Sequence, residues 1–318
     1  PYVDAAVRAG VPCVVRIGEA AGLRTVARWL DDHLDPLVEN RARGAFGAAS
    51  IIVPNSHAAA GNYQADGFKG RYAVVPTGVR LSEIRPANDA ERRAGRLRLG
   101  LREGERVVVC AASVWPVKGQ AMLAKAIDHL RHDHPELVCV LVGLTDHSRG
   151  EAPIGVTDPA YAAAIEHYRD ERDLGDRVRV APFESNLRPY WAAADAAVFP
   201  SESESLPSAA LEAMAAGLPV LASRVGDLPL LIEDGLTGWL CDPCDLGSLT
   251  SALARFGETP PDALGAMSAR ARLKIEMDHD GSEASAKMER ILRAAAEGSE
   301  VGSDTNAYGT YRSQLQSD

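Results

Sequence analysis

The clearest hydrophobic pattern along the chain is a pair of short apolar runs separated by a stretch with helical periodicity. The runs Arg106–Ala111 and Leu137–Val142 are rich in valine and do not alternate between apolar and polar positions. Such runs are typical of strands that are buried on both faces of a parallel sheet. Between them, Gln120–Leu130 carries apolar side chains at spacings of three and four, which predicts an amphipathic helix. The three segments predict a β-α-β unit.

The same alternation continues toward the C-terminus. Further strands are predicted at 178–181, 196–199 and 219–222, and further helices at 159–172, 186–194 and 207–216. Strands that alternate with helices of this length indicate a doubly wound parallel sheet. The predicted fold class is therefore α/β, with a Rossmann-like domain in this part of the chain.

The first part of the chain shows a shorter version of this rhythm. Its predicted strands are 11–17, 51–53 and 72–75, and its predicted helices are 35–49 and 57–66. Residues 76–104 are rich in Arg, Glu, Pro and Gly, and predict a linker with a polar helix. Residues 283–296 are amphipathic, whereas the Gly, Ser, Asp and Gln beyond residue 297 are typical of a disordered tail.

These changes predict two domains followed by a helix and a tail. Residues 1–82 form the later half of a first, acceptor-side Rossmann-like domain, and residues 83–280 form a second one that binds the ligand. Residues 281–297 form a helix that packs back toward the first domain, and residues 298–318 form the tail. The chain begins at Pro1 without an initiator Met, and a doubly wound domain usually needs well over a hundred residues. The first domain is therefore expected to lack its beginning.

Composition and charge exclude several classes of protein. The chain is 46% hydrophobic and 25% charged, as expected of a globular protein and not of a disordered or fibrous one. A net charge of −10 argues against nucleic acid as a partner. No apolar stretch approaches the roughly 18 residues of a membrane-spanning helix, and no signal-peptide pattern is found. The expected location is cytoplasmic, with loose contact with the inner face of the membrane left open.

Two clusters were weighed as metal sites, and neither is favoured. Cys241 and Cys244 have CxxC spacing, but no second pair of cysteines or histidines completes a zinc site. The preferred interpretation is a loop after a strand. His129, His132 and His134 lie beside Arg and Asp at the end of a predicted helix, which is typical of a solvated surface. We expect neither a metal ion nor a cofactor.

The carboxyl ends of the strands are where an open parallel sheet binds its ligand. The segment Ala112–Gly119 follows a predicted strand and carries Lys118, one of only five lysines among 34 basic residues. Because Lys118 precedes a helix, its ammonium group and the N–H groups of the helix start would act together on a phosphate. The alternative is an ordinary surface lysine in a turn.

A second segment, residues 200–217, carries two glutamates eight residues apart. Glu212 is surrounded by Leu, Ala and Met in a predicted helix, so its carboxylate needs polar partners such as sugar or ribose hydroxyls. Glu204 precedes that helix, and the N–H groups of Ser208 and Ala209 at its start are suited to a phosphate. Together these groups indicate a nucleotide-sugar site. The alternative is a loop charge and a salt-bridged helix residue.

The motifs resemble those of the retaining glycosyltransferases of family 4, which have the GT-B fold. They are Glu204 and Glu212 followed by Ala-Met-Ala-Ala-Gly-Leu-Pro-Val, with Pro-Val-Lys118-Gly119-Gln, Val75-Pro-Thr-Gly78-Val and Glu233-Asp-Gly-Leu-Thr-Gly238. The resemblance implies a hexosyltransferase that moves a sugar from a nucleotide sugar to a hydroxyl acceptor with retention of configuration and without a metal ion. The acceptor is left open as a glycan, a lipid-linked molecule or a small molecule.

Carried over by position, the resemblance assigns roles to individual residues. Lys118 would meet the donor diphosphate, Glu212 the ribose hydroxyls, and Glu204 the hydroxyls of the transferred sugar. Backbone groups around Phe183 would meet the base. Lys118 and Glu204 are the predicted catalytic residues, and the predicted donor site comprises Ser113, Lys118, Phe183, Glu204, Leu206, Ser208, Ala209 and Glu212.

Four positions depart from the family pattern. Ser113 stands where an Arg beside the phosphates is usual, and Ser205 replaces a Gly. Asp227 stands where a second Gly is usual, and Leu230 where a Glu is common. These departures leave the expected fold unchanged and leave the identity of the donor open.

Two other functions stay open at this point. One keeps the fold and changes the chemistry to that of a sugar-nucleotide epimerase or a glycan phosphorylase. The other is a non-catalytic nucleotide-binding module, which the short first domain favours. A dehydrogenase is disfavoured because no G-x-G-x-x-G follows a predicted strand. The chain as it stands is expected to bind a nucleoside diphosphate weakly and to transfer sugar poorly.

Overall fold

The computed structural model of the protein describes residues 9, 11–17, 44, 47–143 and 157–299. Contacts between residues divide the chain into two units. Unit 1 comprises Pro1–Arg80, Glu204–Pro207 and Met277–Asp318, and unit 2 comprises Leu81–Ser203 and Ser208–Glu276. Compared with the predicted second domain of residues 83–280, unit 2 starts at Leu81, ends at Glu276 and leaves out the loop 204–207.

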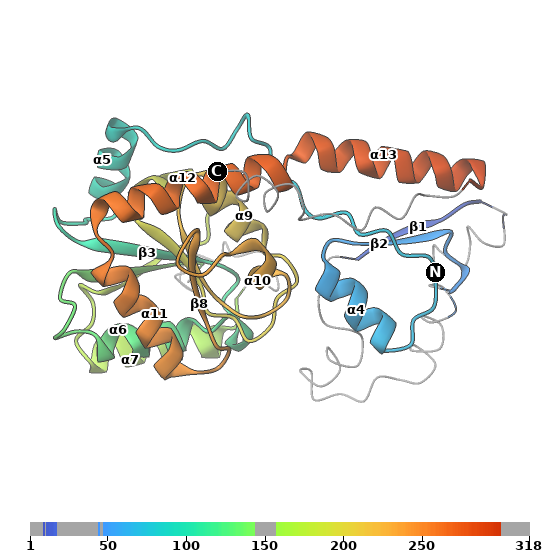
Figure 1. Cartoon of the computed structure of the whole chain (residues 1–318). Coiled ribbons are helices and arrows are strands. Elements are labelled where there is room, and N and C mark those ends of the chain that lie inside the picture. Colours follow the sequence, from blue (N-terminus) through green and yellow to red (C-terminus); the bar gives the residue numbers. More distant parts are fainter. Residues whose placement is uncertain (1–8, 10, 18–43, 45–46, 144–156, 300–318) are drawn as a thin grey trace. The chain divides into compact units, whose positions relative to one another are not determined.

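Unit 2 is built on a six-stranded sheet in which all neighbouring strands are parallel (Figure 1). Its order is β5-β4-β3-β6-β7-β8. The strands are β3 (Arg106–Ala111), β4 (Leu137–Val142), β5 (Val178–Ala181), β6 (Ala196–Phe199), β7 (Val220–Ser223) and β8 (Gly238–Cys241). The chain runs outward from β3 to β5 and then returns to β6, so the order of the strands reverses between β3 and β6. In such sheets this reversal marks the place where ligands bind.

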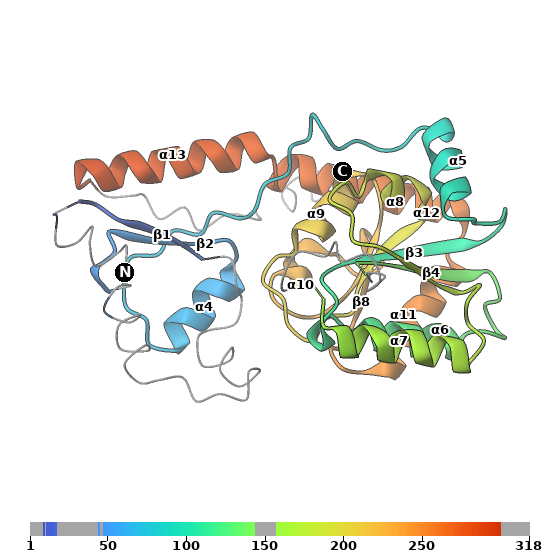
Figure 2. The same cartoon turned by 180° about the vertical axis from the view of Figure 1, so that it is seen from behind.

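Helices cover both faces of this sheet, with α6, α7 and α11 on one face and α5, α8, α9 and α12 on the other (Figures 1 and 2). Their bounds are α5 (Asp89–Arg98), α6 (Gln120–His129), α7 (Pro159–Glu171), α8 (Arg188–Ala193), α9 (Ser208–Ala215), α10 (Leu228–Leu231), α11 (Leu246–Glu258) and α12 (Pro261–Asp278). A short 3-10 helix, η1 (Pro116–Lys118), precedes α6. The doubly wound arrangement predicted from the sequence is confirmed.

The strands β3, β4, β5 and β6 have the predicted bounds, and β7 is displaced by one residue from the predicted 219–222. The helices from α5 to α9 form within the predicted segments, and the short helix α10 follows β7. The sequence analysis predicts no counterpart of β8, α11 or α12. Strand β8 is only four residues long and begins with Gly238, a residue type that is depleted in strands.

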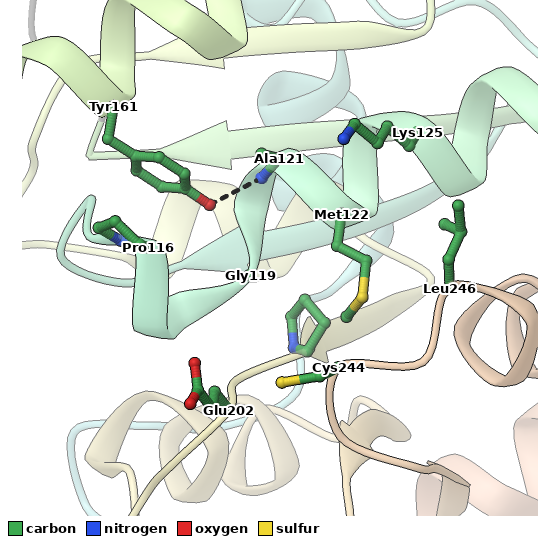
Figure 3. A pocket seen from close by; sticks show the side chains of 10 residues that line it. Pro116, Gly119, Ala121, Met122, Lys125, Tyr161, Glu202, Cys244 and Leu246 are labelled. Atoms are coloured by element: carbon green, nitrogen blue, oxygen red, sulfur yellow. Dashed lines mark hydrogen bonds between the residues drawn. The ribbon is translucent and has the colours of Figure 1, made fainter.

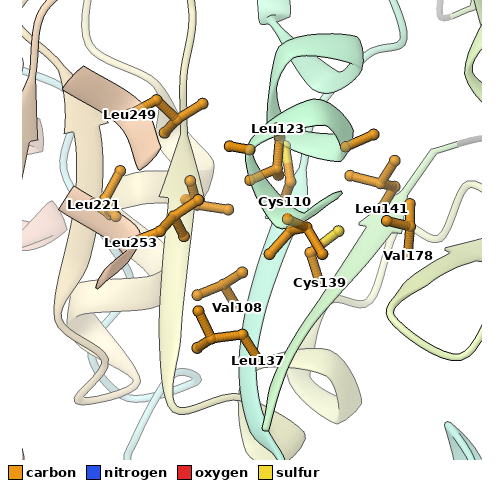
Figure 4. Packing of buried hydrophobic residues seen from close by; sticks show 14 of the residues in the cluster. Val108, Cys110, Leu123, Leu137, Cys139, Leu141, Val178, Leu221, Leu249 and Leu253 are labelled. Atoms are coloured by element: carbon orange, nitrogen blue, oxygen red, sulfur yellow. The ribbon is translucent and has the colours of Figure 1, made fainter. Parts of the chain in front are cut away.

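The core on the α6 side of the sheet is a single hydrophobic cluster (Figure 4). Leu123 of α6 lies over the strands that carry Cys110 and Cys139, and all three side chains are buried. Cys110 and Cys139 are thus small residues of the core, and burial raises the pKa of the Cys139 thiol. Leu253 of α11 packs in the same cluster. Burying one such leucine side chain contributes roughly 1.5–3 kcal/mol to the stability of the folded chain. The many buried side chains of this cluster together hold the strands of the sheet in place.

Unit 1 contains a two-stranded parallel sheet of β1 (Val14–Ile17) and β2 (Ile51–Pro54). The prediction of a third strand at 72–75 is wrong, because Tyr72 forms only an isolated bridge to Ile52. Two N–H groups of this segment still donate to carbonyls of β2 at 2.9 and 3.0 Å. The next residue is Pro76, which has no N–H group with which to continue the ladder.

Two helices complete the described part of unit 1. Helix α4 (His57–Ala65) begins after Ser56, whose side chain accepts a hydrogen bond from the Ala59 N–H at 2.9 Å. Helix α13 (Gly281–Glu297) packs on β2 and on Val75 through the buried side chains Ile291 and Ala295. The helix predicted at 35–49 and the predicted tail at 298–318 lie mostly outside the described residues.

Candidate donor site

Two loops at the carboxyl edge of the unit 2 sheet are held against each other. One follows β3 and leads through η1 into α6, and the other follows β6. The N–H of Glu202 donates to the carbonyl of Val117 at 2.8 Å. Gly119 lies so close to Pro200 that a Cβ on it would be 2.1 Å from the Pro200 carbonyl oxygen. The two loops therefore position each other at the point where the order of the strands reverses.

Lys118 is the last residue of η1 and lies directly before the start of α6. Its side chain is half-buried, and its backbone N–H donates to the Trp115 carbonyl at 2.9 Å. Gly119 has φ +74°, in the left-handed region, which turns the chain from η1 into α6. Beside it, the Gln120 amide donates to the carbonyl of Ser113 at 2.8 Å. Lys118 thus directly precedes the start of a helix.

Glu212 lies in α9 between two fully buried residues, Leu211 and Ala213. Its own side chain is half-buried, and this burial raises the pKa of its carboxyl group. The indole N–H of Trp191 acts in the opposite direction and lowers the pKa of Glu212. A carboxylate in such surroundings is stabilised by hydroxyl donors, which is consistent with a ribose-binding role.

Helix α9 begins at Ser208, so Ser208 and Ala209 form its first turn. Their N–H groups have no acceptor within the helix and are available to an anion. The Ser208 side chain is exposed and that of Ala209 is half-buried. Unit 2 therefore brings Lys118, Glu212 and two helix starts to one end of the sheet.

Glu204 and Leu206 belong to the segment that contacts assign to unit 1. Glu204 is half-buried, and Leu206 is buried. Between them, the Ser205 hydroxyl donates to Asn55 Oδ1 at 2.6 Å and lies 2.7 Å from the Ser56 hydroxyl. This departure from the usual Gly thus places a buried hydroxyl cluster within unit 1.

Phe183 follows β5, and its ring is 41% exposed. The next residue, Glu184, pairs with Arg98 at 2.6 Å, and Arg98 lies over the ring of Tyr190, 5.5 Å from its centre. An exposed ring beside a loop that is held by an ion pair is suited to stack on a flat base.

Asp227 is buried at the start of α10. Its backbone carbonyl accepts hydrogen bonds from the Leu230 and Leu231 N–H groups.

A cavity of about 370 Å³ opens beside these loops (Figure 3). It is lined by Pro116, Gly119, Ala121, Met122, Lys125, Tyr161, Pro200, Glu202, Cys244 and Leu246. The Ala121 N–H donates to the Tyr161 hydroxyl at 2.9 Å. The lining of the cavity includes Gly119 and Pro200, the two residues at which the loops contact each other.

The CxxC pair lies at and beyond the end of β8. Cys241 is buried with its sulfur 3.8 Å from the Ser223 hydroxyl oxygen, whereas Cys244 is exposed. Burial, with the charge of Glu202, raises the pKa of the Cys244 thiol. In the part of the chain that the structure describes, no group of three or more His, Cys, Asp or Glu side chains could hold a metal ion. The helices of that part include none that is long and apolar enough to cross a membrane.

Trp191 is the residue near the site that the sequence analysis misses. It lies in α8 and affects the pKa of Glu212, which lies in α9. No sequence motif links these two helices. Only its place among other apolar residues was visible in the sequence, and that pattern predicts a core residue. No signal in the sequence could have connected it with Glu212.

A Rossmann-like parallel sheet with helix starts at its carboxyl edge is typical of proteins that bind nucleotides. The profile of the family described as "Glycosyl transferases group 1" matches residues 91–274, more than half of the chain. The chain therefore belongs to this family.

Two relatives illustrate the similarity in sequence. The chain is 34% identical over 278 residues to a D-inositol 3-phosphate glycosyltransferase of Streptomyces scabiei, covering 83% of this chain and 59% of the relative. It is 33% identical over 228 residues to a protein of the same name from Mycobacterium avium, covering 70% of this chain and 50% of the relative. The chain thus spans between half and three fifths of the length of these relatives.

Solved structures show the same fold. HepE of Anabaena, solved in complex with UDP, matches with a TM-score of 0.79 and 20% identity over 92% of this chain and 75% of its own. The sucrose-phosphate synthase of Thermosynechococcus elongatus matches with a TM-score of 0.76 and 23% identity over 94% of this chain and 72% of its own. The GT-B fold predicted from the sequence is confirmed.

Proposed function

We propose that this chain acts in the retaining transfer of a hexose from a nucleotide sugar to a hydroxyl group, and that unit 2 binds the donor. The observation that carries the proposal is the placement of Lys118, Glu212 and the starts of α6 and α9 at the strand reversal between β3 and β6. A cation and free N–H groups suit the diphosphate, and a half-buried carboxylate suits the ribose. Membership of the glycosyl transferases group 1 family supports the same reading.

The catalytic contribution of these groups is electrostatic. Negative charge grows on the diphosphate as the bond to the sugar breaks, and the Lys118 ammonium with the N–H groups of α6 and α9 would stabilise it. These groups are held in place by the fold, so little reorganisation is needed when the charge develops. In the proposal Glu204 takes the hydroxyls of the sugar, Ser113 and Leu206 line the donor, and Phe183 meets the base. No residue is assigned as a nucleophile.

The proposal includes no metal ion and no cofactor, and it places the protein in the cytoplasm. Loose contact with the inner face of the membrane, for a lipid-linked acceptor, is part of the same proposal. Because two relatives are named as D-inositol 3-phosphate glycosyltransferases, a phosphorylated cyclitol is the first acceptor to test. Release of a nucleoside diphosphate in its presence is the signal of transfer.

The donor site is tested by calorimetry with UDP, GDP, ADP and pyrophosphate. Lys118→Ala should weaken binding of both a nucleoside diphosphate and pyrophosphate by about 1.5–3 kcal/mol, as expected for a charged hydrogen bond. Glu212→Gln should weaken only the nucleoside diphosphate, because pyrophosphate has no ribose.

Lys125→Ala is the matched control, since Lys125 also lies on α6 but is exposed and lines the neighbouring cavity. Unchanged affinity in Lys118→Ala and Glu212→Gln, or an equal loss in Lys125→Ala, contradicts the assignment of the site.

A further inference from the structure

Gln120 is a polar residue whose side chain is buried at the start of α6. It is 1% exposed, and its amide nitrogen donates to the carbonyl of Ser113 at 2.8 Å. Its amide oxygen has no hydrogen-bond partner among the described residues. Almost all buried polar groups in proteins are paired, because an unpaired one gives up its hydrogen bonds to water without replacement. An apolar side chain of similar length would avoid this cost, so a glutamine at this position calls for a functional explanation.

The hydrogen bond of Gln120 joins the two ends of the loop that carries Lys118. Ser113 is the second residue after β3, which ends at Ala111, and Gln120 is the first residue of α6. Lys118 lies between them, as the last residue of η1. Joining the ends of a loop removes conformational freedom from the chain between them. The Gln120 amide therefore restricts the backbone from which the Lys118 side chain extends.

Two further hydrogen bonds fix the same loop and the helix start that follows it. The backbone N–H of Lys118 donates to the carbonyl of Trp115 at 2.9 Å. The N–H of Ala121 donates to the hydroxyl of Tyr161, which lies in α7, at 2.9 Å (Figure 3). Because these two N–H groups already have acceptors, binding of an anion at this loop depends strongly on where the Lys118 ammonium lies.

The position of a lysine ammonium is easily lost. The ammonium is a compact charge at the end of a flexible stem, and its attraction to an anion falls as the distance between the two charges grows. Holding a long side chain in one place costs conformational entropy, and a backbone that is already fixed lowers what remains to be ordered on binding. The Gln120 amide supplies such a fixed backbone through a hydrogen bond that an apolar residue could not make.

We propose that Gln120 is a positioning residue of the donor site, whose buried amide closes the loop after β3 and thereby holds the Lys118 ammonium in place for the phosphates of a nucleoside diphosphate. The inference rests on the proposed role of Lys118 in binding the diphosphate. It adds a residue that acts through Lys118.

The proposal is tested in the full chain with two variants, Gln120→Met and Gln120→Asn. Methionine has a similar length but no amide, whereas asparagine keeps an amide on a side chain that is one methylene shorter. Both variants lose the hydrogen bond to the Ser113 carbonyl, so calorimetry should show pyrophosphate and UDP bound roughly tenfold more weakly in each. The loss should be smaller than in Lys118→Ala, because the ammonium is displaced and not removed.

A double-mutant cycle shows whether Gln120 acts through Lys118. When Gln120→Met is added to Lys118→Ala, pyrophosphate affinity should fall by less than about twofold further, because the ammonium that the amide positions is already absent. A tenfold loss from Gln120→Met both with and without Lys118 shows that the two residues act independently, and overturns the proposal.

Ile127→Val is the matched control for stability. Ile127 is also a buried residue of α6, and the loss of one methyl group should lower the urea midpoint without changing pyrophosphate affinity. If Ile127→Val weakens pyrophosphate binding as much as Gln120→Met does, the effect comes from a weakened helix and the proposal is wrong. Failure of both Gln120 variants to fold would likewise mean that the amide serves the stability of unit 2 and not the position of Lys118.

The same measurements separate this inference from the proposed function. Unchanged pyrophosphate affinity in both Gln120 variants, with a clear loss in Lys118→Ala, overturns the role of Gln120 and leaves the proposed function standing. Unchanged affinity in Lys118→Ala contradicts the proposed function, and the role of Gln120 falls with it.

Discussion

Glu91 is the residue in which the acidity of a single side chain is most clearly set by its partners. One carboxylate oxygen accepts from the Asn88 N–H at 3.0 Å and closes a capping box at the start of α5. Both oxygens accept from Arg85 at 2.9 Å, and Arg188 of α8 approaches to 2.6 Å. The Asn88 N–H and the two guanidinium groups lower the pKa of Glu91 to about 2.

This acidity predicts a pH-dependent contribution of Glu91 to stability. A carboxyl group whose pKa is lower in the folded chain stabilises it above the pKa of the unfolded chain, here near 4.5, and loses that effect as the pH falls toward about 2. Glu91→Gln should therefore lower the urea midpoint at pH 7, and the difference from the unaltered chain should shrink on acidification. Glu103→Gln, at an exposed position, should show no such difference. A gap between Glu91→Gln and the unaltered chain that stays constant down to pH 3 argues against this role.

At the same scale, the candidate site divides into residues that the sequence reveals and residues that it does not. Lys118 and Glu212 can be recognised because a charge next to a strand end, or inside an apolar helix, is unusual in its local context. Trp191 cannot, because an aromatic residue in an apolar segment looks like any core residue. Its effect on the pKa of Glu212 depends on which helix lies beside α8, and the order of the strands decides that.

At the scale of the elements, the contact between the two loops at Gly119 leaves no room for a Cβ atom. Gly119 combines φ +74° with a position where a Cβ would collide with the Pro200 carbonyl. Gly104 has a similar φ of +83° but open space around it. Alanine at Gly104 would therefore introduce backbone strain alone, whereas alanine at Gly119 would introduce the same strain and a steric clash.

The expected result is a larger loss of stability in Gly119→Ala than in Gly104→Ala. The left-handed conformation alone costs a residue with a side chain about 1–3 kcal/mol, and only Gly119→Ala adds displacement of the loop that carries Lys118. Urea unfolding and UDP calorimetry would measure both effects. Equal losses in the two variants, with unchanged UDP affinity, would show that the loop contact is not needed.

The elements themselves were predicted with uneven success. The strands β3, β4, β5 and β6 are buried on both faces, so their apolar runs stand out from the polar segments around them. Helices α11 and α12 follow β8 directly in the chain, and without a recognised strand before them they were not counted in the alternation. The strand predicted at 72–75 fails because its hydrogen bonding ends at a proline.

At the scale of the whole molecule, helix α13 packs in one of the hydrophobic clusters of unit 1. Ile291 is 1% exposed in a cluster with Ile51, Val53 and Val75, whereas Leu292, the next residue, is 50% exposed. Ile291→Ala should destabilise unit 1 by about 2–5 kcal/mol, the usual cost of such a cavity. Leu292→Ala should change stability by less than about 0.5 kcal/mol.

Unfolding by urea, followed by circular dichroism, would measure these two variants. UDP affinity should be the same in both, because Lys118, Glu212 and Phe183, the residues proposed to meet the diphosphate, the ribose and the base, lie in unit 2. If the folded Ile291→Ala variant binds UDP more weakly in the absence of urea, unit 1 also supports nucleotide binding.

The sequence by itself determined the α/β class, the positions of the long buried strands and the chemical character of Lys118, Glu204 and Glu212. It could do so because burial on both faces and an isolated charge each leave a local pattern that tertiary contacts do not change. Only the tertiary structure decided which strand lies beside which and that Glu204–Pro207 belongs to unit 1. These depend on the packing of segments far apart in the chain, where the free energy comes from surfaces that meet only after folding.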